Sequence, residues 1–436
     1  MSSQRQLTGP AKSTPRAVKG LGRNFAAMLV WQIGNYLVPL ATFPYLTRVL
    51  GPSGFGVLGY VTAIAVYGTV LTEWGFNLSG PQAVVAVKGS PLELNKLIWS
   101  TIGAKACLCV VSFVAVLLVM HFDAQAASAR AAILLSWLVV VGNVFTLNWL
   151  LQGLERFSLF ATVSLAGRFI TLPLTFLLVH KPDDIAVAAG IQAAAPLLTA
   201  IFSIVVAHHL GVLRGPTLSW RAIRLRIASS SEMFISSASV TLFGATNTVI
   251  LASLAGPYQV GLYAAADKLK TVGNMVPAQI NTILYPRVSA LMVDAPRSAA
   301  KLTVLGLIAT AITTIGGVLV LSFLSGHITS LILGRAFHES TTVLQLLCAA
   351  TVFGNLAYFL GLQVLVPFAD SRKRSIVMLA AGCLSIALAL VLVPRFGANG
   401  AAASFLIAEI AILCAYLIII VRSAPMRAHF KQIANW

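Results

Sequence analysis

Long apolar runs, separated by short polar segments, make up most of the chain. A helix needs about 20 apolar residues to cross the ~30 Å hydrocarbon layer of a membrane, and the pattern predicts about twelve such helices. The predicted spans are 25–47, 54–80, 97–121, 131–152, 159–179, 185–208, 228–254, 260–285, 302–324, 341–364, 376–393 and 401–421. Strands of a membrane barrel would instead alternate over ~10 positions. We therefore expect an all-α polytopic membrane protein, whose helices satisfy their own backbone hydrogen bonds.

The composition agrees with this fold class. Of the 436 residues, 58% are hydrophobic and 10% are charged, and the mean hydropathy is +0.89. The hydrophobic fraction is far above that of soluble domains, and the charged fraction is far below it. Residues 1–23 are polar and basic, and the first apolar run is too long for a signal-peptide core and lacks a clear A-x-A cleavage site. We therefore expect the span 25–47 to be retained.

The net charge of +18 raises the question of a nucleic-acid partner, but the basic residues follow the predicted topology. With the N-terminus inside, about 21 of the 30 Lys and Arg residues fall in cytoplasmic segments and about five on the far side. Those five are Arg48, Arg130, Lys181, Arg335 and Arg395. This positive-inside bias predicts that both termini are cytoplasmic, and we expect no nucleic-acid partner. The basic tails are suited to contact with anionic lipid.

Metal and enzyme chemistry find little support in the sequence. The five cysteines fall inside predicted spans, at spacings typical of neither a disulfide framework nor a zinc site. The seven histidines lie at span ends or in loops, without metal-ligand spacing on a helix. The predicted loops are short, so no soluble domain is expected to hold a catalytic site. We expect neither a metal nor a cofactor.

The first and second halves of the chain repeat each other. The segment VLGPSGFGVLGY (49–60) aligns with LAGPYQVGLYAA (254–265) at an offset of 205 residues. The matched residues are Gly51-Pro52 with Gly256-Pro257, Gly56 with Gly261, and Pro81 with Pro286. Two halves of six helices each keep the same orientation in the membrane, as in one class of transporter repeats. We expect two parallel lobes around a central cavity.

This repeat sets the predicted domain organisation. The segments are a basic cytoplasmic N-terminal tail (1–23), an N-terminal six-helix lobe (24–210), a basic cytoplasmic inter-lobe loop (211–227), a C-terminal six-helix lobe (228–421) and a basic cytoplasmic C-terminal tail (422–436).

Polar residues inside the spans form stripes. A charge at the bilayer centre costs about 2.5–3.5 kcal/mol on insertion scales, so it must face protein or water. In 260–285, the residues Asp267, Lys270, Asn274 and Asn281 fall on one helix face, with Lys268 at its edge. Similar stripes are Gln32, Asn35, Pro39 and Thr42; Thr62, Thr69, Glu73 and Asn77; and Ser229, Glu232, Ser236, Ser239 and Asn247. These stripes lie on the first two spans of each repeat, which predicts one water-filled cavity between the lobes.

Structural interpretations of the same residues stay open. Asp267 and Lys270 have the i, i+3 spacing of an ion pair that steadies helix packing. Glu73 lies within two turns of a span end, where its head group can reach water. Arg168 and Glu409 suit contacts between helices. Pro39 and Pro44 interrupt backbone hydrogen bonds in 25–47 and predict a gating element, although static kinks have the same cause.

Several segments resemble one family. They are NYLVPLATFPYLTRVLGPSGFG (35–56), WLLQGLERF (149–157), SLAGRFITLPLTFLLV (164–179), LYAAADKL (262–269) and LYPRVSAL (284–291). In this order they resemble bacterial polysaccharide repeat-unit flippases, the O-antigen and exopolysaccharide branch of the multidrug/oligosaccharidyl-lipid/polysaccharide exporter superfamily. The resemblance covers roughly residues 24–421.

The resemblance implies a non-enzymatic, ion-coupled flippase that works by alternating access in the bacterial inner membrane. It would move undecaprenyl-pyrophosphate-linked oligosaccharide repeat units from the cytoplasmic to the periplasmic leaflet. The implied partners are this lipid-linked oligosaccharide, the bilayer, H⁺ or Na⁺, and a polysaccharide polymerase complex.

The resemblance also implies roles for individual residues. The cationic substrate contacts would be Arg48, Arg168, Lys268 and Lys270. The coupling and polar cavity residues would be Asp267, Glu232, Glu73, Asn274, Asn35 and Asn247.

Two other functions remain as alternatives. The first is a cation-coupled multidrug exporter; such proteins typically place an acid in their first helix, and none occurs between Asn24 and Thr47. The second is an integral-membrane glycan polymerase or ligase. Such an enzyme would carry a large outer loop with catalytic Arg or His, whereas the longest outer loop here, about 325–340, holds only His327, Arg335, His338 and Glu339.

The predicted topology is tested by cysteine labelling in intact cells. A cysteine at position 373 should be shielded from a membrane-impermeant thiol reagent, because the positive-inside bias places it in the cytoplasm. A cysteine at position 258 should be labelled. The reverse pattern would overturn the cytoplasmic assignment of both termini.

Overall fold

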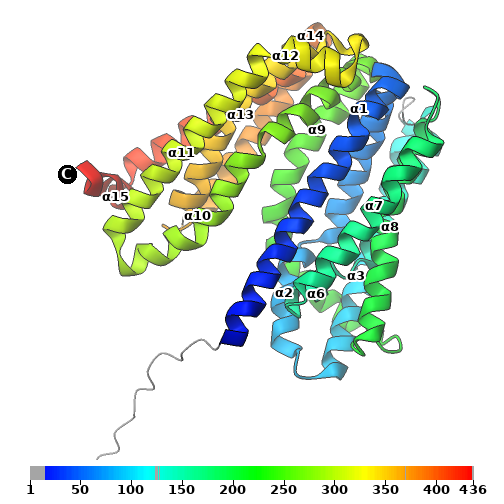
Figure 1. Cartoon of the computed structure of the whole chain (residues 1–436), viewed down its shortest axis with the longest axis vertical. Helices are drawn as coiled ribbons and strands as arrows, with labels where there is room; N and C mark the ends of the chain where they lie inside the picture. Colours follow the sequence, from blue (N-terminus) through cyan, green and yellow to red (C-terminus); the bar gives the residue numbers. More distant parts are fainter. Residues whose placement is uncertain (1–14, 123–125, 127, 369, 435–436) are drawn as a thin grey trace, which may run out of the picture.

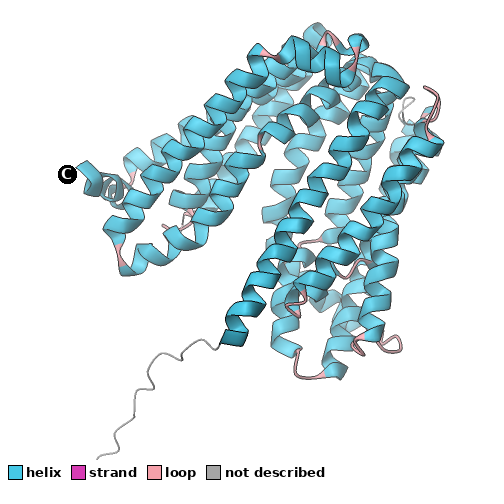
Figure 2. Cartoon of the chain, in the orientation of Figure 1, coloured by secondary structure: helices cyan, strands magenta, loops and turns pink. Residues whose placement is uncertain are grey.

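The computed structural model describes residues 15–434, except 123–125, 127 and 369. This described part contains helices and loops but no strand (Figure 2). The α-helices are α1 Pro15–Glu73, α2 Phe76–Val87, α3 Pro91–Phe122, α5 Arg130–Phe145, α6 Asn148–Gly153, α7 Phe157–Leu178, α8 Ile185–His209, α9 Trp220–Gly273, α10 Met275–Asp294, α11 Pro296–Phe323, α12 Ser325–Ile328, α13 Ser340–Leu360, α14 Ser371–Arg422 and α15 Ala424–Ala434. Shorter helical turns are η1 Thr329–Leu333, η2 Arg335–Phe337 and η3 Gly361–Leu365.

Three long helices are kinked at a glycine. The kinks lie at Gly51 in α1 (φ 64°), Gly256 in α9 (φ 81°) and Gly397 in α14 (φ 53°). Glycine adopts positive φ without a steric penalty, so these residues let the chain turn between two spans. Nine segments of the described residues are long and apolar enough to cross a membrane, and the kinked helices contain two predicted spans each. The all-α fold with about twelve spanning helices is therefore confirmed.

The molecule has two groups of helices that meet at one end and diverge toward the other (Figure 1). We call the end with Gly51 and Gly256 the turn end, and the end where α1 begins the terminal end. The helix α9 passes between the groups. Near the terminal end, the indole of Trp74, in the turn between α1 and α2, stacks on Phe234 at 4.1 Å and donates to the Ile227 carbonyl at 3.0 Å. Further along α9, Asn247 and Ser385 of α14 are hydrogen-bonded at 3.4 Å.

Apolar side chains are distributed as a lipid environment requires. The largest buried cluster lies around the kinks and includes Val61, Leu251 and Val260. Exposed apolar side chains, such as Leu118 on α3 and Ile312 on α11, lie on the outside of the molecule. In water, such an exposed surface would be unfavourable. Its presence over helices of this length identifies a multi-pass membrane protein.

The last helix, α15, is amphipathic and packs on α11. Its Met426 and His429 side chains are buried, whereas Arg427 and Lys431 are exposed. The His429 Nε2 atom lies 3.4 Å from the Thr303 hydroxyl, and its ring contacts the edge of Phe368 at 5.6 Å. Burial lowers the pKa of His429, because the apolar surroundings disfavour the charged imidazolium.

The lowered pKa of His429 makes the docking of α15 sensitive to pH. Protonation favours the undocked helix, so docking should be complete at pH 7.5 and weaken as the pH falls below about 6.5, the ordinary histidine pKa. Hydrogen exchange of residues 424–434 in the purified protein measures this change. The variant His429→Gln should lose the pH dependence, and Arg427→Gln, on the exposed face, should keep it. Equal protection of the native helix at pH 7.5 and 5.5 would contradict this account.

Candidate functional site

A cavity of about 540 Å³ lies between the two groups of helices. Its walls come from both halves of α1, from α7 and α8, and from both halves of α9. We call it the central cavity. The prediction of a cavity built from the first two spans of each repeat is thus extended, because α7 and α8 form a further wall.

Two cations and one acid line the central cavity. Arg168 projects from α7, and Asp267 and Lys268 project from the second half of α9. Among the described residues, no side chain forms a hydrogen bond or ion pair with the Arg168 guanidinium. Lys268 is exposed and forms no ion pair with any other described residue. Two positive charges are therefore available to an anion in the cavity.

Lys270 lies behind this wall. Its Nζ atom is 2.6 Å from the Asp267 Oδ1 atom and 4.7 Å from the centroid of the Phe405 ring. Its side chain is 14% exposed, against 39% for Asp267. The Glu409 carboxylate of α14 lies against Gly354 of α13 and interacts electrostatically with Lys270. Lys270 therefore connects Asp267 to the interior of the C-terminal lobe.

The predicted stripe on this helix needs a correction. From the second half of α9, the cavity is lined by Tyr263, Ala264, Asp267 and Lys268. In an α-helix, the side chains of Lys268 and Lys270 point about 160° apart, and only Lys268 lines the cavity. The sequence pattern located a polar face correctly, but part of that face packs against α13 and α14, as Asn274 also shows. Lys270 is thus absent from the lining of the central cavity in this structure, and its contact with a substrate stays a prediction.

Arg48 was also predicted to face the cavity, and it lies at the turn end instead. Its guanidinium donates to the Leu331 carbonyl of η1, and its side chain is exposed. The residue follows the last predicted span residue of the first half of α1, where the chain leaves the lipid. Arg48 therefore connects the two lobes outside the cavity.

The remaining acids occupy separate places. Glu73 accepts a hydrogen bond from Asn77 and lines a smaller pocket of about 270 Å³ inside the N-terminal lobe. The charge of Glu73 also acts on the buried Lys105, whose ammonium donates to the Asn143 carbonyl at 3.0 Å. Glu232 is exposed on α9 near the terminal end. Among the described residues, Asp267 is the one acid that lines the central cavity together with the two cations.

The predicted amide residues serve mainly in helix packing. Asn247 is buried against Ser385, and the side-chain Oδ1 atom of Asn274 accepts a hydrogen bond from the Asn355 side chain at 2.6 Å. Asn35 is half-buried and lies outside the cavity lining. The side chains of Ser236 and Ser239 lie outside the described residues.

The prolines predicted to act in gating lie in a continuous helix. Pro39 lines the cavity, and the backbone of α1 stays helical through Pro39 and Pro44, its one non-helical residue being Gly51. The Thr47 hydroxyl donates to the Pro44 carbonyl at 3.0 Å. Their role in gating stays a prediction.

Arg168 was expected to contact substrate, but the other polar residues of α7 and α8 in the cavity wall were not foreseen. Thr171 and Thr175 follow Arg168 along α7 and line the cavity with it, and Gln192 joins them from α8. The spacing of Arg168, Thr171 and Thr175, at i, i+3 and i+7, puts them on one helix face. The sequence therefore contained a signal for a polar face on this helix. Whether such a face lines a cavity or packs against protein depends on the neighbouring helices.

The comparisons with known proteins identify the family. A family model described as polysaccharide biosynthesis protein matches residues 21–292. A protein of Escherichia coli (strain K12), named as an O-antigen transporter, is 31% identical over 392 residues, which cover 89% of this chain and 94% of that protein. The chain belongs to the polysaccharide biosynthesis protein family.

Solved structures show that this family member shares the fold of the exporter superfamily. An inward-facing MATE family multidrug transporter of the MOP superfamily superposes with a TM-score of 0.70 at 13% identity, covering 94% of this chain and 99% of that one. The lipid II flippase MurJ, in an inward closed conformation, superposes with a TM-score of 0.69 at 14% identity, covering 95% and 90%. The suspected family is confirmed, and these structures show that the chain shares their fold.

The pairing of Asp267 with Lys270 is tested by a double-mutant cycle on the purified protein. Lys270→Ala should lower the melting temperature more than Asp267→Ala, because Lys270 also faces Glu409, whereas Asp267 is partly open to the cavity. The combined variant should be more stable than the sum of the single effects indicates, by a coupling of about 0.5–3 kcal/mol.

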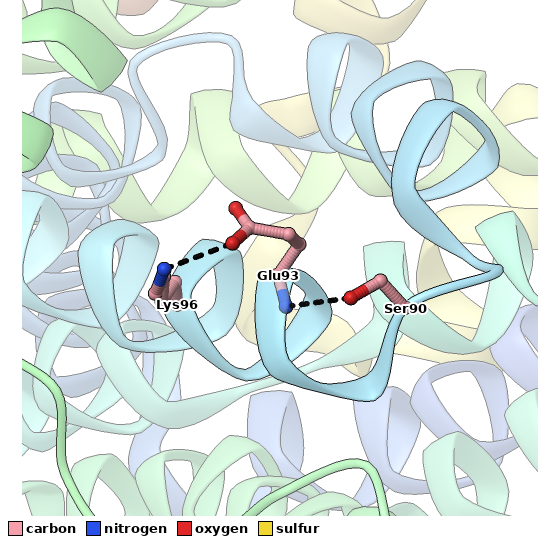
Figure 3. Close-up of polar contacts among 3 residues, drawn as sticks. All are labelled: Ser90, Glu93 and Lys96. Atoms are coloured by element: carbon pink, nitrogen blue, oxygen red, sulfur yellow. Dashed lines mark hydrogen bonds and ion pairs between the residues drawn. The ribbon is translucent and has the colours of Figure 1, made fainter.

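The exposed pair Glu93 and Lys96 is the matched control (Figure 3). It has the same i, i+3 spacing, an Nζ to Oε1 distance of 2.8 Å, and side chains that are 51% and 52% exposed. Such surface pairs couple by about 0–1 kcal/mol. An equal coupling in both pairs would show that the Asp267–Lys270 pair adds no stability beyond that of a surface pair.

Proposed function

We propose that this protein is a flippase for undecaprenyl-pyrophosphate-linked oligosaccharide repeat units. It moves them from the cytoplasmic to the periplasmic leaflet of the bacterial inner membrane by alternating access, with both of its termini in the cytoplasm. The observation that carries this proposal is the central cavity between the lobes, with Arg168 and Lys268 unpaired in its wall. Two of the similar proteins are named as an O-antigen transporter and a lipid II flippase, and this supports the same substrate class.

The charges in the cavity suit a pyrophosphate. This group carries at least two negative charges, and charge-assisted hydrogen bonds to it are strong in surroundings of low dielectric constant. Arg168 offers a planar fork that fits phosphate oxygens, and Lys268 offers a compact charge from a different helix of the cavity lining. A cationic drug would be repelled by the same two groups, which argues against the multidrug exporter.

The polar groups around Arg168 suit a sugar. The hydroxyls of Thr171 and Thr175 and the amide of Gln192 line the same part of the cavity. The Gln192 amide can donate and accept hydrogen bonds. The two threonine hydroxyls donate to carbonyls of their own helix at 2.9 and 3.1 Å, and their oxygens can accept hydrogen bonds from sugar hydroxyls. The volume of about 540 Å³ falls within the usual range of small-molecule sites. The polyprenyl chain, which is apolar, stays in the bilayer.

Asp267 is the residue we propose for ion coupling. It lines the cavity on one side and is bonded to Lys270 on the other. Binding of H⁺ or Na⁺ to its carboxylate would neutralise its charge and weaken its ion pair with Lys270. A substrate anion near Lys268 and an ion at Asp267 therefore influence each other's binding through the charge of the Asp267 carboxylate. Lys270 then acts by positioning Asp267.

Export in a gene-deletion strain tests the function. Arg168→Ala and Lys268→Ala should each lower polysaccharide export at least about tenfold at unchanged protein level, because each removes a charged hydrogen bond of ~1.5–3 kcal/mol. Lipid-linked repeat units should accumulate on the cytoplasmic leaflet. Arg168→Lys should keep part of the activity, and Lys96→Ala, which removes a surface cation, should keep all of it. Normal export by the Arg168→Ala, Lys268→Ala double variant would refute the proposed site.

A further inference from the structure

We propose that two symmetric glycine–proline contacts between the lobes form the gate at the turn end of the central cavity. In this gate, the backbone of each lobe fills the space that a side chain would occupy on the other. The gate is closed in this structure, and it must separate for a substrate to leave at the turn end. This inference concerns how the cavity opens and does not depend on which molecule is carried.

The contact begins at the two kinks. Gly51 and Gly256 have nearly the same backbone conformation, with φ and ψ of 64° and 179° in the first and 81° and 174° in the second. Each is followed by a proline that starts a new helical segment, as proline does favourably at a first helical turn. Pro52 and Pro257 are thus equivalent residues, placed at equivalent points of the two lobes.

One helical turn later, each lobe has a glycine against the proline of the other lobe. A Cβ atom added to Gly56 would lie 2.7 Å from the carbonyl carbon of Pro257 and 2.8 Å from the Gly261 nitrogen. A Cβ atom added to Gly261 would lie 2.8 Å from the carbonyl carbon of Pro52 and 3.2 Å from the Gly56 nitrogen. The carbonyl oxygens would be closer still. Neither lobe can therefore carry a larger residue here while the other stays in place.

The next turn of the same contact forms the roof of the cavity. A Cβ atom on Gly59 would lie 3.3 Å from the Cβ atom of Ala264, the residue at the equivalent position of the second repeat. Both Gly59 and Ala264 line the central cavity. The cavity therefore starts directly beneath the closed contact, and separation of the two helices at Gly56 and Gly261 would open it to the turn end.

Side chains around the contact complete the closure. Phe55 and Phe337 come from opposite lobes, are both buried, and meet edge to face with centroids 6.3 Å apart. Arg48 donates to the Leu331 carbonyl of the opposite lobe. Within the described residues at the gate, no ion pair joins the lobes. Close approach through small residues relies on dispersion and weak Cα–H···O contacts, which can break without leaving a buried charge.

A disulfide tests whether the gate must open. In a variant without the five native cysteines, Gly59→Cys with Ala264→Cys should cross-link under mild oxidation, because their Cβ atoms would lie close to the ~3.5–4.5 Å separation of disulfides. Export should be lost on oxidation and recover on reduction. Unchanged export by the fully cross-linked protein would overturn the proposal.

A second measurement needs no substrate. Spin labels at the equivalent, exposed positions Ser53 and Tyr258 report the separation of the lobes at the turn end. Gly56→Ala and Gly261→Ala should each shift the distance distribution by at least ~2 Å to longer values, since ordinary helix pairs pack 8–10 Å apart. Both together should shift it further. Gly316→Ala, at a helical glycine with open space around it, is the control and should leave the distance unchanged. An unchanged distance in the double alanine variant would overturn the proposal.

Discussion

The cost of placing an unpaired polar group in hydrocarbon controls this structure. Each unsatisfied backbone group in the bilayer costs several kcal/mol, which restricts a chain of this hydropathy to helices. The same cost applies to side chains, so every charge inside a span needs a partner or contact with water. The distribution of charges within the helices therefore reveals where water enters. Arg168 and Lys268, without partners in the described chain, mark the central cavity.

The charges inside the spans fall into two groups with different consequences. Lys105 and Lys270 are each held by protein groups, the Asn143 carbonyl in one case and Asp267 in the other. Removing one partner of such a contact leaves a charge in a poor environment, so these residues stabilise the lobes. Arg168 and Lys268 have their charge available instead, which costs stability and serves binding. Asp267 belongs to both groups, since it touches the cavity and Lys270.

The repeat explains both the symmetry and the asymmetry of the molecule. The Gly-Pro kinks and the glycines that follow them form a contact in which each half plays the same part. A contact of this kind needs small residues at matching positions in both halves, and the alignment at an offset of 205 residues supplies them. The cavity wall is asymmetric, because Arg168 comes from α7 of the first repeat while Lys268, the other cation of the lining, comes from α9. Symmetric packing can thus open and close a cavity whose chemistry differs between its two sides.

Much of the fold could be predicted from the sequence, because membrane insertion depends on local properties. The length of each apolar run, the Gly-Pro pairs at 51–52 and 256–257 and the repeat are all visible along the chain, and the structure agrees with them. The family resemblance rested on short ordered segments and was confirmed by the comparison with known proteins. Helical periodicity also located the polar face that contains Asp267.

The sequence by itself determined which helix faces are polar, since a period of 3.6 residues follows from backbone geometry. Only the tertiary structure decided what those faces meet. Lys268 and Lys270 lie two residues apart, and one faces the cavity while the other faces Phe405 and Glu409. Arg48 could contact either a cavity or a neighbouring loop until the position of η1 was known. The reason is physical: a polar face specifies that a partner must exist, and the packing of other helices decides whether that partner is water, protein or substrate.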